Sequence, residues 1–476
     1  MPDDPSLPAP LRSPVGFTRS LGVVGVLFLT LSVATPASSV FVIVPGMFKV
    51  AGTGTLWALL LAAFVCVATA FIYAELSSAW PVAGGEYVAV AHTLGPLAGF
   101  TMLGVNVFNN LLFPPVAGLG ISAVLTGIWP GLPPVPIAIA VVATSTLVAL
   151  WEIRVNAWIT GIFLLVEALA LAAVAVLGFA TRARGIGAFL VHPVMPRAGM
   201  LVAASPAAIG LATSIAIFAL NGYGAAVYFG EEMHDAPRLI GRTIMIALVV
   251  TLGFELVPSI AALAGTPDLA HLLVAEDPFG SLVRIRGGAD TEALVAIGVG
   301  IAIVNAIIAC ILACARFFYG TARDHAWGRP LDRLMVQIHP RFGSPWIGTL
   351  LVGAVGIGCC LLPLTLLLVL SGSGLVAIYA GLALAAIVGR RHGSTAHARY
   401  RMPLYPLAPV VTLLALGYVV WTSWLDIDEG RPALIATALQ IVAAAAYYRF
   451  VLRPRGDWIV HLPDNGESHE HRPRRA

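Results

Sequence analysis

Two short stretches of this chain place helix-breaking residues and polar side chains in the middle of long apolar runs. The first stretch is Thr35-Pro36-Ala37-Ser38-Ser39, at the centre of a run from 21 to 45 that is long enough to cross a bilayer as a helix. Pro36 has no N–H and its ring crowds the carbonyl of Ser32, so the helix should break there. Free backbone groups at membrane depth are costly unless they face protein or water. The break therefore predicts a polar site inside the membrane.

The second stretch is Asn221-Gly222-Tyr223-Gly224, inside the apolar run 205–230. Each glycine costs about 1 kcal/mol relative to alanine inside a helix, so this helix should also be interrupted. The breaks fall in the first and sixth apolar segments. Transporters with inverted repeats place discontinuous helices at corresponding positions of their two halves, with the substrate between them. A single break more often means only a kinked helix, but two at matched positions favour a binding site.

The breaks also indicate what such a site would bind. A half-helix that begins after a break exposes N–H groups and the positive end of its dipole, which suits a carboxylate. A half-helix that ends before a break exposes carbonyls, which suit an ammonium group. An α-amino acid carries both groups on neighbouring atoms. The pattern therefore predicts a site for a zwitterion.

The composition shows what kind of scaffold must position these breaks. The 476 residues are 59% hydrophobic and only 11% charged, whereas a soluble domain is about 25% charged. This indicates a polytopic, all-α membrane protein. The formal charge of +3 does not point to a nucleic-acid partner. Apolar segments of spanning length are expected near 21–47, 55–80, 96–128, 134–150, 156–179, 205–230, 243–264, 291–319, 346–362, 364–389, 407–425 and 432–451. The longest connections, 181–204, 265–290 and 320–345, are predicted to be loops.

The placement of positive charges predicts the orientation of these segments. If the N-terminus is inside, twenty of the 27 lysines and arginines lie on the cytoplasmic side. The other seven, on the outer side, are Lys49, Arg182, Arg184, Arg197, Arg284, Arg286 and Arg431. Positive charge marks cytoplasmic loops, so both termini should be cytoplasmic in the plasma (cell inner) membrane. Residues 1–19 and 453–476 are expected to be tails, the second one disordered.

Four stretches carry a resemblance to a known family. Pro36–Phe41 (PASSVF) looks like a variant of the G-S-G-[IV]-F turn in the first span of amino acid–polyamine–organocation (APC) permeases. Tyr73–Val88 (YAELSSAWPVAGGEYV) is close to the second-span signature of that family and is the most specific match. Glu231–Arg242 and Ala315–Trp346 resemble the loops after spans six and eight. The resemblance covers about residues 15–455 in order.

This resemblance implies a leucine-transporter-like fold of about 12 transmembrane helices. The transport core would be 20–390, with inverted repeats of five helices each at about 20–180 and 205–390. Helices 1 and 6 would be discontinuous, and 391–452 would hold peripheral helices 11 and 12. The resemblance also implies transport of amino acids or related amines, without a cofactor or a metal.

The family motif can be transferred to this chain residue by residue. The amides of Ala37, Ser38 and Ser39 would hold the substrate carboxylate. The carbonyls of Thr35, Phe218 and Asn221 would hold the amine, and Phe218 would also be an aromatic gate. The predicted substrate-binding residues are thus Thr35, Ala37, Ser38, Ser39, Phe218, Asn221, Gly222 and Tyr223.

Two positions depart from the motif. Ser39 replaces the usual second glycine and narrows the room beside the carboxylate. Gly224 stands where many members of the family have glutamate, so an acidic group is missing there.

Two acids at membrane depth are the candidates for proton coupling. Glu167 lies in the middle of the fifth segment and Glu255 in the middle of the seventh. An ionised carboxylate in hydrocarbon is costly, so such residues face the protein interior, pair, or take up a proton. A structural role, as a protonated glutamate bonded to a neighbouring carbonyl, is equally compatible with the sequence. Glu75 and Glu86 are expected to brace the loop after span two. Asn106, Asn109 and Asn110 could line the pathway or hydrogen-bond between helices, and the second role is the safer interpretation.

The sequence favours a secondary active transporter working by alternating access over proteins of other classes. No filter-like loop of a channel occurs, and the H-E-x-x-H, G-x-S-x-G and G-x-x-x-x-G-K-[ST] motifs of enzymes and ATP-driven pumps are absent. An ion channel or a non-transporting amino-acid sensor stays the alternative. The amino acid or amine, the coupling ion, symport or exchange and the oligomeric state are left open.

Overall fold

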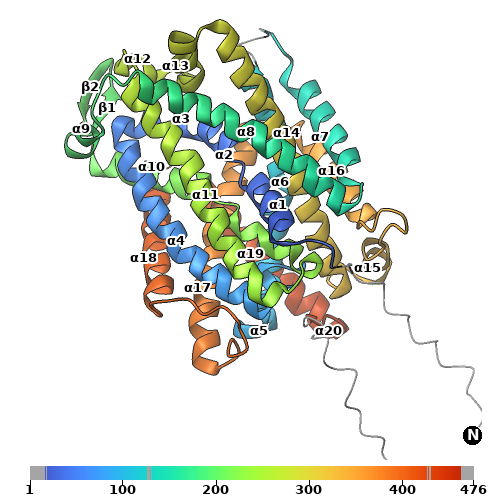
Figure 1. Ribbon diagram of the computed structural model, residues 1–476. Coiled ribbons are helices and arrows are strands. Elements are labelled where there is room, and N and C mark those ends of the chain that lie inside the picture. The colour runs from blue at the N-terminus through green and yellow to red at the C-terminus, as the bar shows by residue number, and fades with distance from the viewer. Residues whose placement is uncertain are drawn as a thin grey trace, which may run out of the picture.

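The computed structural model describes residues 17, 19–125, 129, 131–425, 427 and 430–461. They form a helical bundle whose only strands, within this described part, are one short hairpin (Figure 1). The elements up to the hairpin are α1 (Val23–Ala34), α2 (Pro36–Ser38), the π-helix η1 (Ser39–Ile43), α3 (Val44–Ala51), the 3₁₀ helix η2 (Gly52–Gly54), α4 (Thr55–Ala79), α5 (Glu86–Leu94), α6 (Pro96–Leu125), α7 (Pro134–Ala149), α8 (Ile153–Ala180), α9 (Ile186–Val191), β1 (Val194–Arg197) and β2 (Met200–Ala203).

The second half of the chain begins after the antiparallel hairpin β1–β2. Its elements are α10 (Pro206–Ala219), the 3₁₀ helix η3 (Tyr223–Glu232), α11 (Ala236–Gly265), α12 (Leu269–Val274), α13 (Pro278–Gly287), α14 (Ala289–Arg323), α15 (Arg329–Met335), α16 (Trp346–Cys359), α17 (Leu364–His392), α18 (Leu407–Leu425), α19 (Gly430–Tyr447), the π-helix η4 (Tyr448–Leu452) and α20 (Arg453–Arg455).

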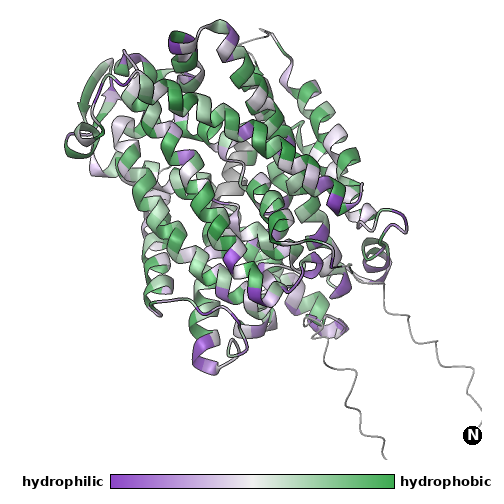
Figure 2. Ribbon diagram, viewed as in Figure 1, coloured by the Kyte–Doolittle hydropathy of each residue, from purple (hydrophilic) through white to green (hydrophobic). Residues whose placement is uncertain are grey.

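The bundle has the surface of an integral membrane protein. Among the described residues, nine helical stretches are long and apolar enough to cross a bilayer, and the first, Val23–Ala79, runs for 57 residues. Two shorter apolar helices, α7 and α16, accompany them. Hydrophobic residues cover the middle of the bundle and hydrophilic ones gather near its ends (Figure 2), and large apolar side chains such as Trp158 are exposed. Each segment expected from the sequence overlaps a helix, but twelve crossings stay a prediction.

The three long connections are not the plain loops that the sequence predicted. They contain α9 with the hairpin, α12 with α13, and α15. Local capping explains the helices of the second connection: the carboxylates of Asp268 and Asp277 accept the N–H groups of His271 and Gly280, at 3.0 and 2.8 Å. Elements α9, α12, α13 and the hairpin lie at one end of the bundle, and α5, α15 and α20 lie toward the other (Figure 1).

Buried and half-buried ion pairs and the C-terminal segment stabilise the end of the bundle that holds α5 and α15. Glu75 pairs with Arg390, Glu231 with Arg323, and Glu232 with Arg316. Residues 456–461, which we name the C-terminal strap, cross this end: His461 contacts the buried carboxylate of Asp324 with its backbone N–H and with Nδ1, the latter at 2.7 Å. Part of the predicted C-terminal tail therefore packs on the bundle. Residues 1–16, 18 and 462–476, in the predicted tails, lie outside the described residues.

Candidate functional site

The first predicted break is present and is centred on Thr35. Helix α1 ends at Ala34, and Thr35 adopts φ 49° and ψ 58°, a left-handed conformation that is strained for a residue other than glycine. Pro36 begins the next helical turn, where its missing N–H costs least. The chain then passes through the π-helix η1 before α3, and π-bulges are frequent at functional sites.

The second predicted break is also present, and it touches the first. Helix α10 ends at Ala219, and η3 begins at Tyr223 after Gly222, whose φ is 107°. A Cβ atom on Gly222 would lie 2.4 Å from Cα of Ala34, so only glycine lets the backbones approach this closely. The hydroxyl of Ser39 donates to the carbonyl of Ala219 at 3.0 Å. The two interrupted helices therefore meet directly.

Only one of the three amides expected to hold a carboxylate is unoccupied. The Ala37 N–H donates to Oε1 of Glu167 at 2.7 Å, and the Ser39 N–H donates to the carbonyl of Thr35 at 3.0 Å. Within the described part of the chain the Ser38 N–H has no protein acceptor. The Ala37 and Ser39 amides thus have protein acceptors in this structure, and the role of all three amides in holding a carboxylate stays a prediction.

The same break leaves carbonyls at the end of α1 without their usual donors. Pro36 has no N–H for the carbonyl of Ser32, and the N–H of Ala37 points to Glu167 instead of to the carbonyl of Val33. Helix α10 ends at the same place, so the negative ends of two helix dipoles converge here. This is an environment for a cationic group such as an ammonium.

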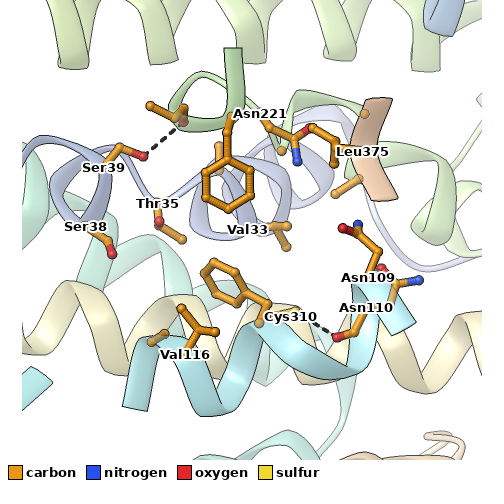
Figure 3. A pocket seen from close by; sticks show the side chains of 18 of the residues that line it. Val33, Thr35, Ser38, Ser39, Asn109, Asn110, Val116, Asn221, Cys310 and Leu375 are labelled. Carbon is orange, nitrogen blue, oxygen red and sulfur yellow. Dashed lines mark hydrogen bonds between the residues drawn. The ribbon is translucent and has the colours of Figure 1, made fainter. Parts of the chain in front are cut away.

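A cavity of about 150 Å³ lies along the meeting point of the breaks. In Figure 3, Thr35, Ser38 and Ser39 lie on one side of it and Asn221, Asn109 and Asn110 on another. Its lining includes six of the eight predicted binding residues: Thr35, Ser38, Ser39, Phe218, Asn221 and Gly222. The other two, Ala37 and Tyr223, are completely buried outside the lining.

The cavity also has two polar residues that were not expected there, Glu86 and Tyr228. Asn106, Asn109 and Asn110 line it as well, which is one of the two roles that the sequence left open for them. The sequence predicted that Glu86 braces a loop. Gly85, with φ 72°, instead turns the chain closely against η3, since a Cβ atom on Gly85 would lie 2.4 Å from the Tyr228 ring. The pair of glycines before Glu86 was the signal that could have indicated a close backbone approach.

Tyr73 connects this polar end of the cavity to the second break. Its ring fills the space that Gly224 leaves, since a Cβ atom on Gly224 would lie 2.6 Å from it. The Tyr73 ring packs edge-on against Tyr379 at 5.9 Å, and the Tyr379 hydroxyl donates to Oδ1 of Asn221 at 2.6 Å. Gly224, which stands where many members of the family have glutamate, thus leaves room for the ring of Tyr73.

The two acids proposed for proton coupling lie behind the first break and not in the cavity lining. Glu167 and Glu255 are completely buried. Oε2 of Glu167 and both carboxylate oxygens of Glu255 have no hydrogen-bond partner among the described residues. The two carboxyl groups interact electrostatically with each other, and Glu255 also interacts with Ser39. A buried polar group without a partner needs an explanation, and proton coupling stays the prediction for these two acids.

The cysteines of the described chain form no metal centre with their neighbours. The thiols of Cys310 and Cys314 lie 3.8 Å apart, and Cys310 lines the cavity. No group of three or more histidine, cysteine, aspartate or glutamate side chains in the described chain could hold a metal ion.

Comparison with known proteins identifies the family. A family model described as "Amino acid permease" matches residues 21–444. An uncharacterized transporter of Mycobacterium tuberculosis is 30% identical over 350 residues, 73% of this chain and 74% of that protein. The methylthioribose transporter of Bacillus subtilis is 26% identical, over 79% of this chain and 83% of its own. A branched-chain amino acid permease of the same bacterium is 22% identical, over 86% and 89%.

These relatives are transport proteins and not enzymes. The matched region includes both helix breaks and the whole lining of the cavity. The chain therefore belongs to the amino acid permease family of the amino acid–polyamine–organocation superfamily.

Proposed function

We propose that this permease is a secondary active transporter that moves amino acids or related amines by alternating access, coupled to protons or working by exchange. The observation that carries the proposal is the contact of the two broken helices beside a cavity. The ammonium would lie at the carbonyl ends of α1 and α10, near Thr35 and Asn221, and the carboxylate at the Ser38 N–H. Ser39, Phe218 and Gly222 would shape the site.

The order of helix lengths supports an inverted repeat of five helices. In the first half, the broken helix is followed by α4 of 25 residues, α6 of 30, α7 of 16 and α8 of 28. In the second half, the broken helix is followed by α11 of 30 residues, α14 of 35, α16 of 14 and α17 of 29. The short fourth member recurs at the same place in each half. This arrangement is the one in which transporters bind substrate at the midplane.

Counterflow in proteoliposomes tests the proposal. Vesicles preloaded with an unlabelled amino acid should take up the labelled compound transiently against its gradient, because a carrier exchanges substrate through one site. A channel would show no counterflow, and a sensor would bind without flux. A thermal-shift screen of amino acids and amines on the purified protein selects the compounds to use. No counterflow with any compound that binds would contradict a carrier.

A further inference from the structure

Glu86 stands out among the cavity residues because it brings a carboxylate into a lining that is otherwise neutral. The residue is buried, yet it belongs to the lining together with the break residues. Of the described residues that line the cavity, it is the one acidic residue, and none is basic. A substrate in this cavity therefore meets one ionisable side chain; burial raises the pKa of its carboxyl, and the hydrogen bonds from Tyr228, Tyr73 and Asn106 act in the opposite direction.

The hydrogen bonds of Glu86 come from neutral donors. Oε1 accepts from the Tyr73 hydroxyl at 3.1 Å. Oε2 accepts from Nδ2 of Asn106 at 2.9 Å and from the Tyr228 hydroxyl at 2.7 Å. Three donors on two oxygens fit the ionised form, which only accepts hydrogen bonds. They hold the carboxylate in place from three helices, α4, α6 and η3, without neutralising it.

No basic side chain of the described chain neutralises Glu86 either. Three arginines at the end of the bundle that holds α5 and α15 pair with other acids: Arg316 with Glu232, Arg323 with Glu231, and Arg390 with Glu75. A buried ion without a counter-charge is unfavourable unless something else supplies the opposite charge. The open space beside Glu86 is the substrate cavity, so a substrate can supply it.

We infer that Glu86 is a specificity-determining residue that selects substrates carrying a second positive charge, such as a dibasic amino acid or a diamine. This rests on the proposed function. The first amine binds at the carbonyl ends of the two broken helices, and the second reaches the carboxylate across the cavity. Asn109 and Asn110 line the same cavity and offer further hydrogen-bonding groups. A neutral substrate leaves the carboxylate without a counter-charge.

Paired probes that differ in charge test this inference on the purified full-length protein. Lysine is compared with norleucine, and arginine with citrulline, by competition against a bound radiolabelled amino acid. The wild type should bind the charged member of at least one pair about ten-fold to a hundred-fold more tightly, the range for a hydrogen bond to a charged group. In Glu86→Gln this ratio should fall to about one, through loss of affinity for the charged compound alone.

A second variant separates the charge of Glu86 from its role in packing. Tyr228→Phe removes one of the three donors but keeps the carboxylate, so the preference for the charged probe should remain. If Glu86 only braces α4, α6 and η3, Glu86→Gln should weaken both members of a pair equally, and Tyr228→Phe should do the same; that result would overturn the inference. A wild type that prefers the neutral probes, or makes no distinction, would overturn it while leaving the proposed function intact. A wild type that binds no amino acid or amine would contradict the proposed function itself.

Discussion

Thr35 and Gly222 hold the two helix breaks in contact by different means. Thr35 is a branched residue in a left-handed conformation, which the surrounding packing must enforce. Gly222 adopts its positive φ without strain, and its missing side chain lets Ala34 approach. The site therefore depends on a strained backbone at Thr35 and on the absence of a side chain at Gly222.

Gly222→Ala should disrupt the site by separating these backbones. The added methyl group would lie 2.4 Å from Cα of Ala34, where nothing flexible can move aside. We expect the melting temperature to fall, with a loss of about 1–3 kcal/mol in stability, and ligand binding to be lost. Gly46→Ala is the matched control, because a Cβ atom there meets nothing within 4 Å. Normal binding by Gly222→Ala would contradict the close contact of the breaks.

Ser38→Pro should abolish substrate binding while the protein still inserts and folds. The substitution removes the one amide of the turn that lacks an acceptor in the described chain, and it adds no charge. Ser38→Ala keeps the N–H and should bind normally. Isothermal titration with the best ligand of the thermal-shift screen makes the comparison. Unchanged affinity in the proline variant would refute the assignment of the carboxylate to this amide.

The sequence predicted the breaks at the residue level, and six of the eight predicted binding residues line the cavity, but it did not predict the acceptor of the Ala37 N–H or the presence of Glu86 in the lining. Pro36 and the two glycines disrupt helices through their own covalent structure, so their effect is visible in the sequence. The acceptor of the Ala37 N–H is Glu167, 130 residues away, and no local pattern could reveal it. Glu86 was missed because its hydrogen-bond partners belong to three other elements, and the two glycines before it indicated only a close backbone approach.

At the level of elements, α8 and α11 bring two buried carboxyl groups behind the turn α2. Close contact between these helices is possible because Gly178 faces Ala261, where a Cβ atom would lie 2.3 Å from the Ala261 carbonyl oxygen. Glu167 binds the Ala37 N–H and therefore contacts the same turn that presents Ser38 to the cavity. A proton taken up or released by this pair would act directly on the turn that we propose to bind substrate.

Glu167→Gln should remove the pH dependence of uptake, and Glu255→Gln is the second choice. The amide mimics a protonated acid and keeps its size, so loss of folding is a weak confounder. Uptake into proteoliposomes is measured from about pH 5 to pH 8 with each variant and the double variant. A full pH profile in all three would show that the proton is carried elsewhere or not at all. If uptake required sodium, this result would also argue against proton coupling by these two acids.

The elements themselves were only partly predictable. Long apolar runs indicated the long helices, because twenty or so apolar residues have few other structures available in a membrane. The short helices α12 and α13 were missed, because they depend on single capping aspartates within polar connections. Periodicity over six to ten residues is too short a signal to distinguish them from loops.

For the whole molecule, the distribution of positive charge predicts that both termini are cytoplasmic. Two connections expected outside, 181–204 with α9 and the hairpin and 265–290 with α12 and α13, lie at one end of the bundle. Elements α5, α15 and α20 lie toward the other end (Figure 1). The orientation of these ends relative to the membrane is set by the translocation machinery and not by packing, so it stays a prediction.

Cysteine labelling in intact cells tests this orientation. In a chain whose five native cysteines are replaced by alanine or serine, a membrane-impermeant maleimide should label Arg197→Cys, on the hairpin, from outside. Arg391→Cys, an exposed position at the end of α17, should react only after the cells are opened. The opposite pattern would place the termini outside.

The C-terminal strap has a consequence for biosynthesis. Asp324 is completely buried, and the residue that contacts its Oδ1, His461, comes 137 positions later in the chain. At about 5–20 residues per second, translation needs roughly 7–27 s to cover that distance. Until then, Asp324 has the Tyr87 hydroxyl, at 2.8 Å on Oδ2, but not the strap. The bundle thus acquires this cover only after the strap has been made, and a chain cut before residue 456 would leave the ribosome with this acid uncovered.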